Sequence, residues 1–529
     1  MQPRRRAALF LLILAVLLPH WPAGRVDFVY DDEDFIVANP AVHSAAAAAR
    51  AFFEPFPLDQ PARRLYRPVT ALSYGVDFTL WGGDARGFAY TNMVLYLIVV
   101  LLAWRFLSWQ LHSPSTAFLA AMFFAVHPVH AEAVDAIAGR SELLALLFAL
   151  LSIRWYQAAL GSEETQRGRN ALPAACRPWF WPLASALAYA LACGAKETAV
   201  VLPGVLACLG AVRLCEGKAG QGEVRRALLP LLPHLSVLAA YLIVRRAALG
   251  GFLPVRTTLG GVDFTGRVLT AGSVFLEYLR LLLFPVKLQI DGYYLARVGI
   301  TRAPTPRALV GLTLLAVLVS IAGVVAARIV RRDSFGAPPA ADERFPRRAL
   351  LGGLAFFFIF LLPVGHLLPM GALMAERFLF APSLGFVLAG AAACRLLWLR
   401  LAPRLSDRRR RAARLAGGCA LLVLAGLGGW RTHARAREWR DAVRLWQAAD
   451  RDIPGSYLVK TNLAAEMMQR GDLAGAERAL LEALTIRPQA PEATYNLELI
   501  SRTKAPVVGP GGRPTKLPAP EEAPGKKGP

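Results

Sequence analysis

Eleven apolar runs, each close to the length of a membrane-spanning helix, recur along this chain. They lie near residues 7–22, 89–109, 115–132, 141–160, 179–195, 198–214, 228–244, 307–327, 349–369, 376–397 and 415–430. A helix needs roughly 20 mostly apolar residues to cross the hydrocarbon core of a bilayer, so some of these runs are short. Because 55% of the residues are hydrophobic and the mean hydropathy is +0.41, the sequence predicts an all-α integral membrane protein with about eleven spans.

The basic residues predict which side of the membrane each loop faces. The formal net charge is +23, but Lys and Arg gather in short clusters between the apolar runs. This pattern follows the positive-inside rule and argues against nucleic acid as a partner. The predicted cytoplasmic segments carry Arg4, Arg5, Arg6, Arg167, Arg169, Arg177, Lys218, Arg225, Arg226, Arg328, Arg331, Arg332, Arg347, Arg348, Arg404, Arg408, Arg409, Arg410 and Arg411.

The charge pattern also fixes the predicted topology. The N-terminal run lacks a small-residue cleavage site, so we interpret it as a retained first span. The apolar run 268–285 contains Glu277 and Arg280, and a full crossing there would place the last two basic clusters outside. We therefore predict a re-entrant or interfacial helix at 268–285. Two long extracytoplasmic loops follow, near 23–88 and 245–306, and the chain ends outside.

The six cysteines predict neither a disulfide framework nor a zinc site. All lie in or beside apolar runs, and no CxxC pair occurs. They are Cys176, Cys193, Cys208, Cys215, Cys394 and Cys419.

The composition becomes that of a soluble segment after Trp430. Residues 458–491 fit one tetratricopeptide unit of about 34 residues, with a Gly-Asp turn between two helices. We predict a membrane domain at 1–430, a short extracytoplasmic repeat region at 431–504 and a disordered tail at 505–529. The repeats would dock on the membrane domain or on a protein partner, since isolated repeats bury too little surface. The alternative is an amphipathic helical hairpin without a binding role.

The first predicted outer loop carries acids among apolar residues, in VDFVYDDEDFIVANP. Apolar neighbours favour a packed site, in which a partly desolvated Asp31 or Asp32 could act as a base. A solvated acidic loop is the alternative. The same loop holds Arg67, kept extended by Pro68. Arg67 could bind a lipid phosphate or extend toward lipid headgroups.

The connection after the third run places several ionisable residues near the membrane surface. His127 and His130 bracket a proline, and Glu132 and Arg140 follow. The histidine spacing could serve a metal, but no further Cys or His lies nearby, so we predict no metal site. Ionisable groups at membrane depth are commonly functional. Hydrogen bonding within an interfacial helix is the rival interpretation.

Two further ionic pairs begin apolar runs. Lys196 and Glu197 stand at one such place, and Glu376 and Arg377 at another. The pair at 196 and 197 could neutralise itself or leave Lys196 facing a lipid phosphate. Several cations near one membrane surface would suit an anionic lipid carrier.

Together these segments resemble a known family. The segments are VDFVYDDEDFIVANPAV, YRPVTALSY, FFAVHPVHAEAVDAIAGRSELLALLF, KETAVVLP, LLLFPVKLQID and AERFLFAPSLGF. In this order, over roughly 24–500, they resemble the transmembrane and tetratricopeptide-repeat O-mannosyltransferases. More distantly they resemble the protein O-mannosyltransferases of the GT-C glycosyltransferase fold.

The resemblance implies a GT-C bundle with catalysis in the first outer loop, a polyprenyl- or dolichyl-phosphate sugar donor and a Ser/Thr acceptor on protein. The family's acidic pair falls on Asp31 and Asp32, and its Lys-Glu pair on Lys196 and Glu197. Its histidine-bearing loop falls on His127 and His130, and its last outer loop on Glu376 and Arg377. The repeat array here is much shorter than in many relatives. The resemblance therefore does not imply that these repeats hold an extended protein substrate.

We therefore predict an inverting sugar transfer with Asp31 or Asp32 as base. Arg67, Arg140, Lys196 and Arg377 are the predicted phosphate-binding residues. His127, His130, Glu132, Glu197 and Glu376 are further site candidates. No cofactor besides the lipid-linked donor is predicted, and a divalent metal stays open.

The alternatives are a GT-C transferase with another lipid-linked sugar or a lipid or glycan acceptor, and a non-catalytic membrane-anchored scaffold. A transporter is disfavoured, because its ionisable groups would lie near the bilayer midplane. The Ala- and Arg-rich composition suggests a bacterial inner membrane with the site facing the periplasm. In a eukaryote the site would face the lumen of the endoplasmic reticulum.

Overall fold

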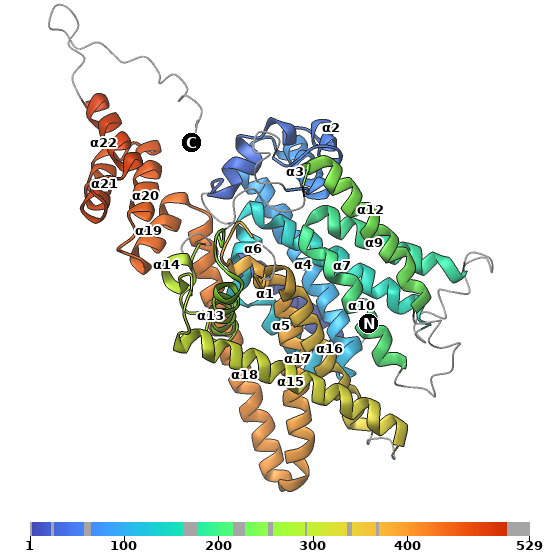
Figure 1. The fold of residues 1–529 in the computed structure, drawn as a ribbon. Helices are drawn as coiled ribbons and strands as arrows, with labels where there is room; N and C mark the ends of the chain where they lie inside the picture. Colours follow the sequence, from blue (N-terminus) through green and yellow to red (C-terminus); the bar gives the residue numbers. More distant parts are fainter. Residues whose placement is uncertain are drawn as a thin grey trace, which may run out of the picture. The chain divides into compact units, whose positions relative to one another are not determined.

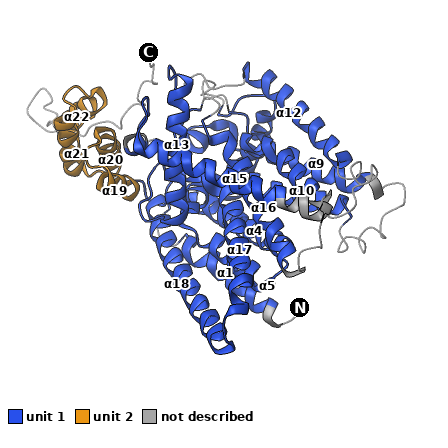
Figure 2. Cartoon of the chain, turned by 60° about the horizontal axis from the view of Figure 1, so that its bottom comes forward, with its two compact units in different colours: residues 1–442 blue, residues 443–529 orange. Residues whose placement is uncertain are grey.

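The computed structural model describes residues 3–22, 26–57, 65–161, 177–214, 228–251, 258–290, 294–335, 341–366 and 370–504. The secondary-structure elements of these residues are all helices, with no strand among them, which confirms the predicted all-α class. The chain divides into two compact units, Met1–Ala442 and Val443–Pro529 (Figure 2). The cysteines Cys176 and Cys215 and the predicted disordered tail at 505–529 lie outside the described residues.

The first unit is a bundle of helices (Figure 1). Its α-helices are α1 (Pro3–His20), α2 (Ala45–Ala48), α3 (Pro68–Trp81), α4 (Ala85–Leu111), α5 (Pro114–Ala125), α6 (Ala131–Asp135), α7 (Arg140–Ala159), α9 (Arg177–Ala195), α10 (Leu202–Leu214), α12 (Leu232–Leu249), α13 (Phe264–Leu283), α14 (Tyr294–Val298), α15 (Pro306–Phe335), α16 (Ala341–Leu361), α17 (Phe380–Leu401) and α18 (Asp407–Trp439).

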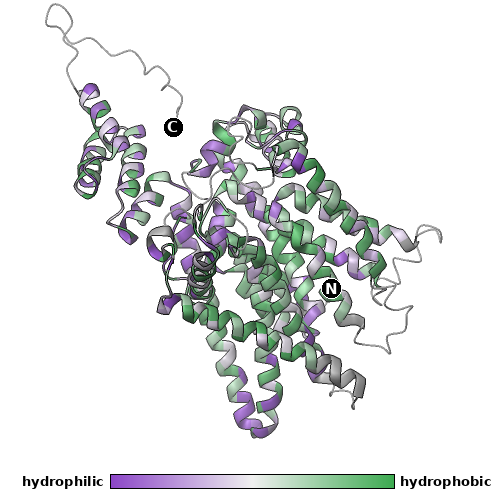
Figure 3. Cartoon of the chain, in the orientation of Figure 1, coloured by the Kyte–Doolittle hydropathy of each residue, from purple (hydrophilic) through white to green (hydrophobic). Residues whose placement is uncertain are grey.

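Six described helices are long and apolar enough to cross a membrane. They occupy Ala85–Leu111, Leu229–Leu249, Pro306–Ala327, Glu343–Val364, Glu376–Arg404 and Asp407–Trp439. Figure 3 shows hydrophobic colour along α15 and hydrophilic colour at the turn between α17 and α18. These findings support an integral membrane protein. The remaining predicted spans include α1, α7, α9 and α10, and the total of eleven stays a prediction.

The apolar run at 115–132 is broken rather than continuous. Helix α5 ends at Ala125, α6 begins at Ala131 after a 3-10 turn, and the two halves are bent by 50°. Pro128 causes the break, because it lacks an N–H and its ring clashes with the preceding helical turn. The His127 side chain accepts a hydrogen bond from the main-chain N of Val129 at the break. The sequence pattern missed this break, which brings polar side chains to the end of the bundle.

The first predicted outer loop is folded. Between α1 and α4 lie short helical turns and α3, which begins at Pro68 as the fixed φ of proline favours. Apolar side chains of this segment form a core of their own that includes Phe35, Phe56, Tyr74 and Ile137. Ile137 follows α6, so this core joins the first loop to the break after α5.

Helix α13 corresponds to the apolar run at 268–285. It is absent from the six candidate spans among the described residues. Whether it is re-entrant or spanning therefore stays a prediction.

The second unit consists of α19 (Ala442–Asp452), α20 (Tyr457–Gln469), α21 (Leu473–Ile486) and α22 (Pro491–Lys504). Helices α20 and α21 form a hairpin whose turn includes Gly471, with φ of 80°. Its core consists mainly of small side chains, among them Ala464, Ala476 and Ala483. The tetratricopeptide assignment and the predicted domain boundaries stay predictions.

Close packing of α16 on α17 depends on glycines and generates a stability prediction. A Cβ on Gly385 would lie 2.5 Å from the main-chain N of Phe357, whereas a Cβ on Gly390 would meet nothing within 4 Å. We predict that Gly385→Val destabilises the protein by about 1 to 3 kcal/mol through overpacking. Gly390→Val on the same helix is the matched control. Thermal unfolding of the purified protein in detergent measures both, and equal melting temperatures would contradict the predicted packing.

Candidate active site

The two acids that begin the first loop's helical turns have different environments. The Asp32 side chain is buried, and its residue is only 1% exposed. Its Oδ2 accepts from the main-chain N of Val29 at 3.0 Å, and its Oδ1 accepts from that of Ala138 at 2.6 Å. The Asp31 side chain is 21% exposed and lies 3.5 Å from the Nη2 of Arg377. Asp32 therefore fastens the loop to the segment after α6, and Asp31 remains accessible.

The backbone before the acidic pair has an unusual conformation. Tyr30 has φ of 59°, in the left-handed region, where a residue other than glycine costs roughly 1 to 2 kcal/mol. Burial raises the pKa of Asp32 to about 7, against the opposing hydrogen bonds from Val29 and Ala138. Asp32 is thus a poorly solvated anchor for a strained turn.

Arg377 connects Asp31 to the broken helix. Its main-chain N donates to Oε2 of Glu132 at 2.9 Å, and its Nη1 donates to Oε1 of the same residue at 2.6 Å. Glu132 is fully buried at the start of α6. Arg377 itself is partly exposed, so the buried carboxylate orients a cation toward the accessible side of Asp31.

A second arginine faces the same region from the start of α3. Arg67 donates from Nε and Nη2 to the two carboxylate oxygens of Glu197, at 2.9 and 2.7 Å. Both side chains are partly exposed. This two-point contact fixes the plane of the guanidinium. The positive charge of Arg377 opposes the rise that Glu197 produces in the pKa of Arg67.

Lys196 and Glu197, which one sequence interpretation paired with each other, each form an ion pair with another residue. Lys196 is buried and forms an ion pair with Glu142 in the first turn of α7. Burial lowers the pKa of Lys196, and the charge of Glu142 opposes that effect. The Phe378 ring lies beside two cations, with its centroid 5.4 Å from Lys196 Nζ and 5.8 Å from Arg377 Cζ.

Seven ionisable residues described above form what we call the ionic cluster. They are Asp31, Arg67, Glu132, Glu142, Lys196, Glu197 and Arg377. The buried members hold the partly exposed ones in place, and Asp31, Arg67, Glu197 and Arg377 face the accessible side. A carboxylate beside two oriented guanidinium groups can take a proton from one reactant and stabilise an anion on another.

Arg140 lies in the protein interior, which argues against its predicted role in binding phosphate. It is fully buried and donates to Asp77 Oδ2 at 2.5 Å and Asn92 Oδ1 at 2.7 Å. It also donates to the main-chain oxygens of Ser73 and Phe88, each at 3.1 Å. These contacts join α3, α4 and α7, so Arg140 braces the elements that carry the cluster.

The histidines have structural partners. His130 contacts Tyr96 Oη at 2.9 Å and Ser383 Oγ at 2.8 Å through its two ring nitrogens. His127 contacts the main-chain O of Leu282 at 3.1 Å. Both rings are buried. Within the described ranges, no group of three or more His, Cys, Asp or Glu side chains could hold a metal ion.

Glu376 points away from the cluster although its neighbour Arg377 belongs to it. It is fully buried and accepts from Tyr294 Oη at 2.9 Å, from the main-chain N of Gln289 and from Arg435 Nη2 at 3.4 Å. Glu376 therefore ties the 3-10 turn that precedes α17 to α14 and α18.

Sequence reasoning did not identify Glu142 as the partner of Lys196, or Phe378 as the ring between two cations. Glu142 is 54 positions from Lys196, so no local pattern pairs them. The Phe after Glu-Arg is a visible signal, because an aromatic face attracts cations.

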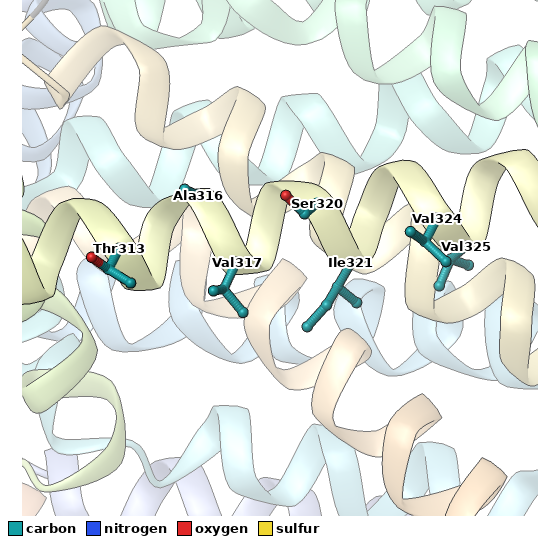
Figure 4. Close-up of a pocket in the computed structure, with 7 residues that line it drawn as sticks. All are labelled: Thr313, Ala316, Val317, Ser320, Ile321, Val324 and Val325. Carbon is teal, nitrogen blue, oxygen red and sulfur yellow. The ribbon is translucent and has the colours of Figure 1, made fainter.

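One open groove lies apart from the cluster. It has a volume of about 630 Å³ and runs along one face of α15 (Figure 4). Thr313, Ala316, Val317, Ser320, Ile321, Val324 and Val325 line it. None of these side chains is ionisable, so the groove supplies none of the chemistry considered above.

Comparison with known proteins agrees with the resemblance seen in the sequence. The chain is 26% identical to human protein O-mannosyl-transferase TMTC1, over 90% of this chain and 55% of that protein. It is 26% identical to human TMTC4, over 85% of this chain and 62% of that protein. It is also 26% identical to protein O-mannosyl-transferase F38B6.6 of Caenorhabditis elegans, over 91% of this chain and 63% of that protein.

The resemblance to the TMTC family is confirmed. The chain spans 55% to 63% of the length of these TMTC relatives. No protein-family model matches it.

Among solved structures, the archaeal oligosaccharyltransferase AglB of Archaeoglobus fulgidus, bound to an inhibitory peptide and a dolichol-phosphate, aligns with TM-score 0.40 and 14% identity. It covers 85% of this chain and 56% of AglB. The apo form of the same enzyme aligns with TM-score 0.43 and 12% identity, over 82% of this chain and 56% of the enzyme. Scores below 0.5 do not establish a shared fold, so the GT-C architecture stays a prediction.

The raised pKa of Asp32 predicts a pH dependence of stability. An acid whose pKa is higher in the folded state than in the unfolded state stabilises the fold at low pH and loses that contribution as pH rises toward the folded pKa. We expect the stability of the wild type relative to Asp32→Asn to fall between pH 4 and 7. With about 1.4 kcal/mol for each pKa unit, the change is at most roughly 4 kcal/mol.

Thermal unfolding of both proteins across that pH range measures the difference. Parallel pH profiles would mean that Asp32 is ionised in the folded protein as it is in the unfolded chain.

Proposed function

We propose that this chain is a glycosyltransferase that moves a sugar, mannose, from a polyprenyl-phosphate carrier to Ser or Thr hydroxyls of protein. The relatives are named protein O-mannosyl-transferases, and the apolar helices suit a lipid-linked donor. The observation that carries the proposal is the ion pair of the accessible Asp31 with Arg377 beside the Arg67–Glu197 pair. A GT-C bundle is the architecture that we propose for it.

The reaction inverts the configuration at the sugar. The acceptor oxygen attacks the anomeric carbon, the bond from that carbon to the phosphate oxygen breaks, and the hydroxyl proton passes to the base. The lipid phosphate leaves with the bonding electrons and gains negative charge. Oriented cations stabilise that charge without reorganising during the reaction.

Of the two acids, Asp31 is the better base. A base must come within hydrogen-bond reach of the acceptor hydroxyl. The oxygens of Asp32 are buried and accept from the main-chain N of Val29 and Ala138. Asp31 is accessible, and Arg377 holds it beside the cations. Asp32 then acts as a positioning residue.

Of the four predicted phosphate ligands, we retain Arg67 and Arg377 for direct contact. Both are partly exposed, and each is oriented by a glutamate. Lys196 is buried against Glu142 and contributes its charge from behind the site. The polyprenyl tail lies between membrane helices, and a protein segment is the acceptor. The repeat region could hold a protein partner.

We also propose that the site faces the extracytoplasmic side, which is the periplasm if the membrane is a bacterial inner membrane. The positive-inside pattern of the sequence supports this orientation.

The roles of the two acids predict different losses of activity. We expect Asp31→Asn to lower sugar transfer by about 10² to 10⁴, the usual contribution of general acid-base catalysis. Asp32→Asn should lower it less and should alter thermal stability. Radiolabelled polyprenyl-phosphate mannose in purified membranes measures transfer into protein.

Glu54→Gln is the matched control, because Glu54 is an acid of the same loop paired with the exposed Arg50. Equal transfer by the wild type and Asp31→Asn would exclude Asp31 as the base. If the wild type transfers no mannose but does transfer another lipid-linked sugar, the donor proposed here is wrong.

A further inference from the structure

A second charged site surrounds one carboxylate on α13. Glu277 is buried, with a side chain 3% exposed. Three arginines contact it: Arg280 Nη2 at 2.7 Å, Arg297 Nε at 2.9 Å and Arg307 Nη2 at 2.7 Å. We call Arg280, Arg297 and Arg307 the arginine triad. They come from α13, α14 and α15, so the fold brings them together.

The triad carries more charge than its carboxylate balances. In the described part of the chain, Glu277 is the one carboxylate that forms ion pairs with these arginines. Three guanidinium groups and one carboxylate leave an excess of two positive charges. The arginine side chains are 25% to 35% exposed, so the positive side faces outward. Such a charge excess near a membrane favours an anion.

The three arginines have different amounts of donor capacity left. Arg280 donates from its terminal nitrogens to the main-chain oxygens of Phe284 and Lys287. Arg307 donates from Nη1 to the main-chain O of Arg297 at 3.2 Å and from Nη2 to Glu277 Oε2 at 2.7 Å, which leaves one N–H on each terminal nitrogen. No hydrogen bond within the described ranges uses the terminal nitrogens of Arg297. Arg280 thus orients the carboxylate, and Arg297 and Arg307 present donors outward.

The surroundings indicate a lipid. Arg307 is the second residue of the candidate span Pro306–Ala327, which places it at the level of lipid headgroups. Beside the triad, Phe284 and Val286 are 67% and 69% exposed, and Leu309 on α15 is half exposed. Cations next to exposed apolar side chains at the end of a span match a phosphate headgroup with its hydrocarbon chains.

We propose that the arginine triad binds the phosphate of a membrane lipid, through Arg297 and Arg307. Arginine suits this ligand because its fork of donors matches phosphate oxygens. The phosphate could belong to an anionic phospholipid or to a polyprenyl phosphate. Unlike simple extension of basic side chains toward headgroups, the site is built around a buried carboxylate that accepts hydrogen bonds from Arg280 and Arg307 and forms an ion pair with Arg297. It does not depend on the transferase activity.

The test is lipid binding by the full chain purified in detergent micelles. Labelled protein is titrated with dioleoylphosphatidylglycerol and, separately, with the zwitterionic dioleoylphosphatidylcholine. We expect preference for phosphatidylglycerol and about 30-fold weaker binding by the double variant Arg297→Gln with Arg307→Gln, since each cation near the surface contributes about a fivefold effect. Replacing both arginines with lysine should weaken binding less than replacing them with glutamine, because lysine keeps the charge but lacks the fork of donors.

Arg302→Gln is the matched control, because Arg302 is an exposed arginine of the same region. An equal loss in Arg302→Gln, or no preference for phosphatidylglycerol, would overturn the site. So would unchanged binding in a double Gln variant that melts at the wild-type temperature. A second titration with undecaprenyl phosphate identifies the source. Displacement of phosphatidylglycerol at lower concentration assigns the site to the carrier lipid, and no such displacement assigns it to bulk phospholipid.

Discussion

The contact between Arg377 and Glu132 is the interaction on which the proposed site depends. It joins residues that are 245 positions apart and uses both a main-chain and a side-chain donor of Arg377. A buried carboxylate without such a partner would be strongly destabilising. The break after α5 at Pro128 turns Glu132 toward Arg377, and Arg377 in turn reaches Asp31. A proline, a buried acid and one arginine thereby connect the broken helix to the first loop.

Depth of burial divides the ionisable residues into two groups. Arg140, His130 and Glu376 are buried and have interior partners, so they set the spacing of the helices. Asp31, Arg67 and Arg377 are held by similar contacts on one side but remain accessible on the other. Polar side chains in a membrane domain need partners, whether they are fully buried or partly accessible. The presence of an ionisable residue in a sequence motif therefore does not show whether it stabilises the fold or contacts the substrate.

This division explains how far the sequence could predict the structure. Hydrophobicity is a local property, so the apolar run at 89–109 predicted the helix Ala85–Leu111 within a few residues. Ion pairing is not local. Lys196 stands next to Glu197 in the chain yet pairs with Glu142, and Glu197 pairs with Arg67. Burial of Asp32 and accessibility of Asp31 could not be predicted either, because neighbouring residues on a turn point in different directions.

An experimental structure of the full chain with a polyprenyl phosphate bound would test the proposed donor site. The central claim is that the ionic cluster holds the phosphate of the donor. We predict phosphate oxygens within hydrogen-bond distance of both Arg67 and Arg377, with Asp31 facing the sugar-binding side. A phosphate that contacts neither arginine, and lies instead on the arginine triad alone, would exclude the ionic cluster as the donor site.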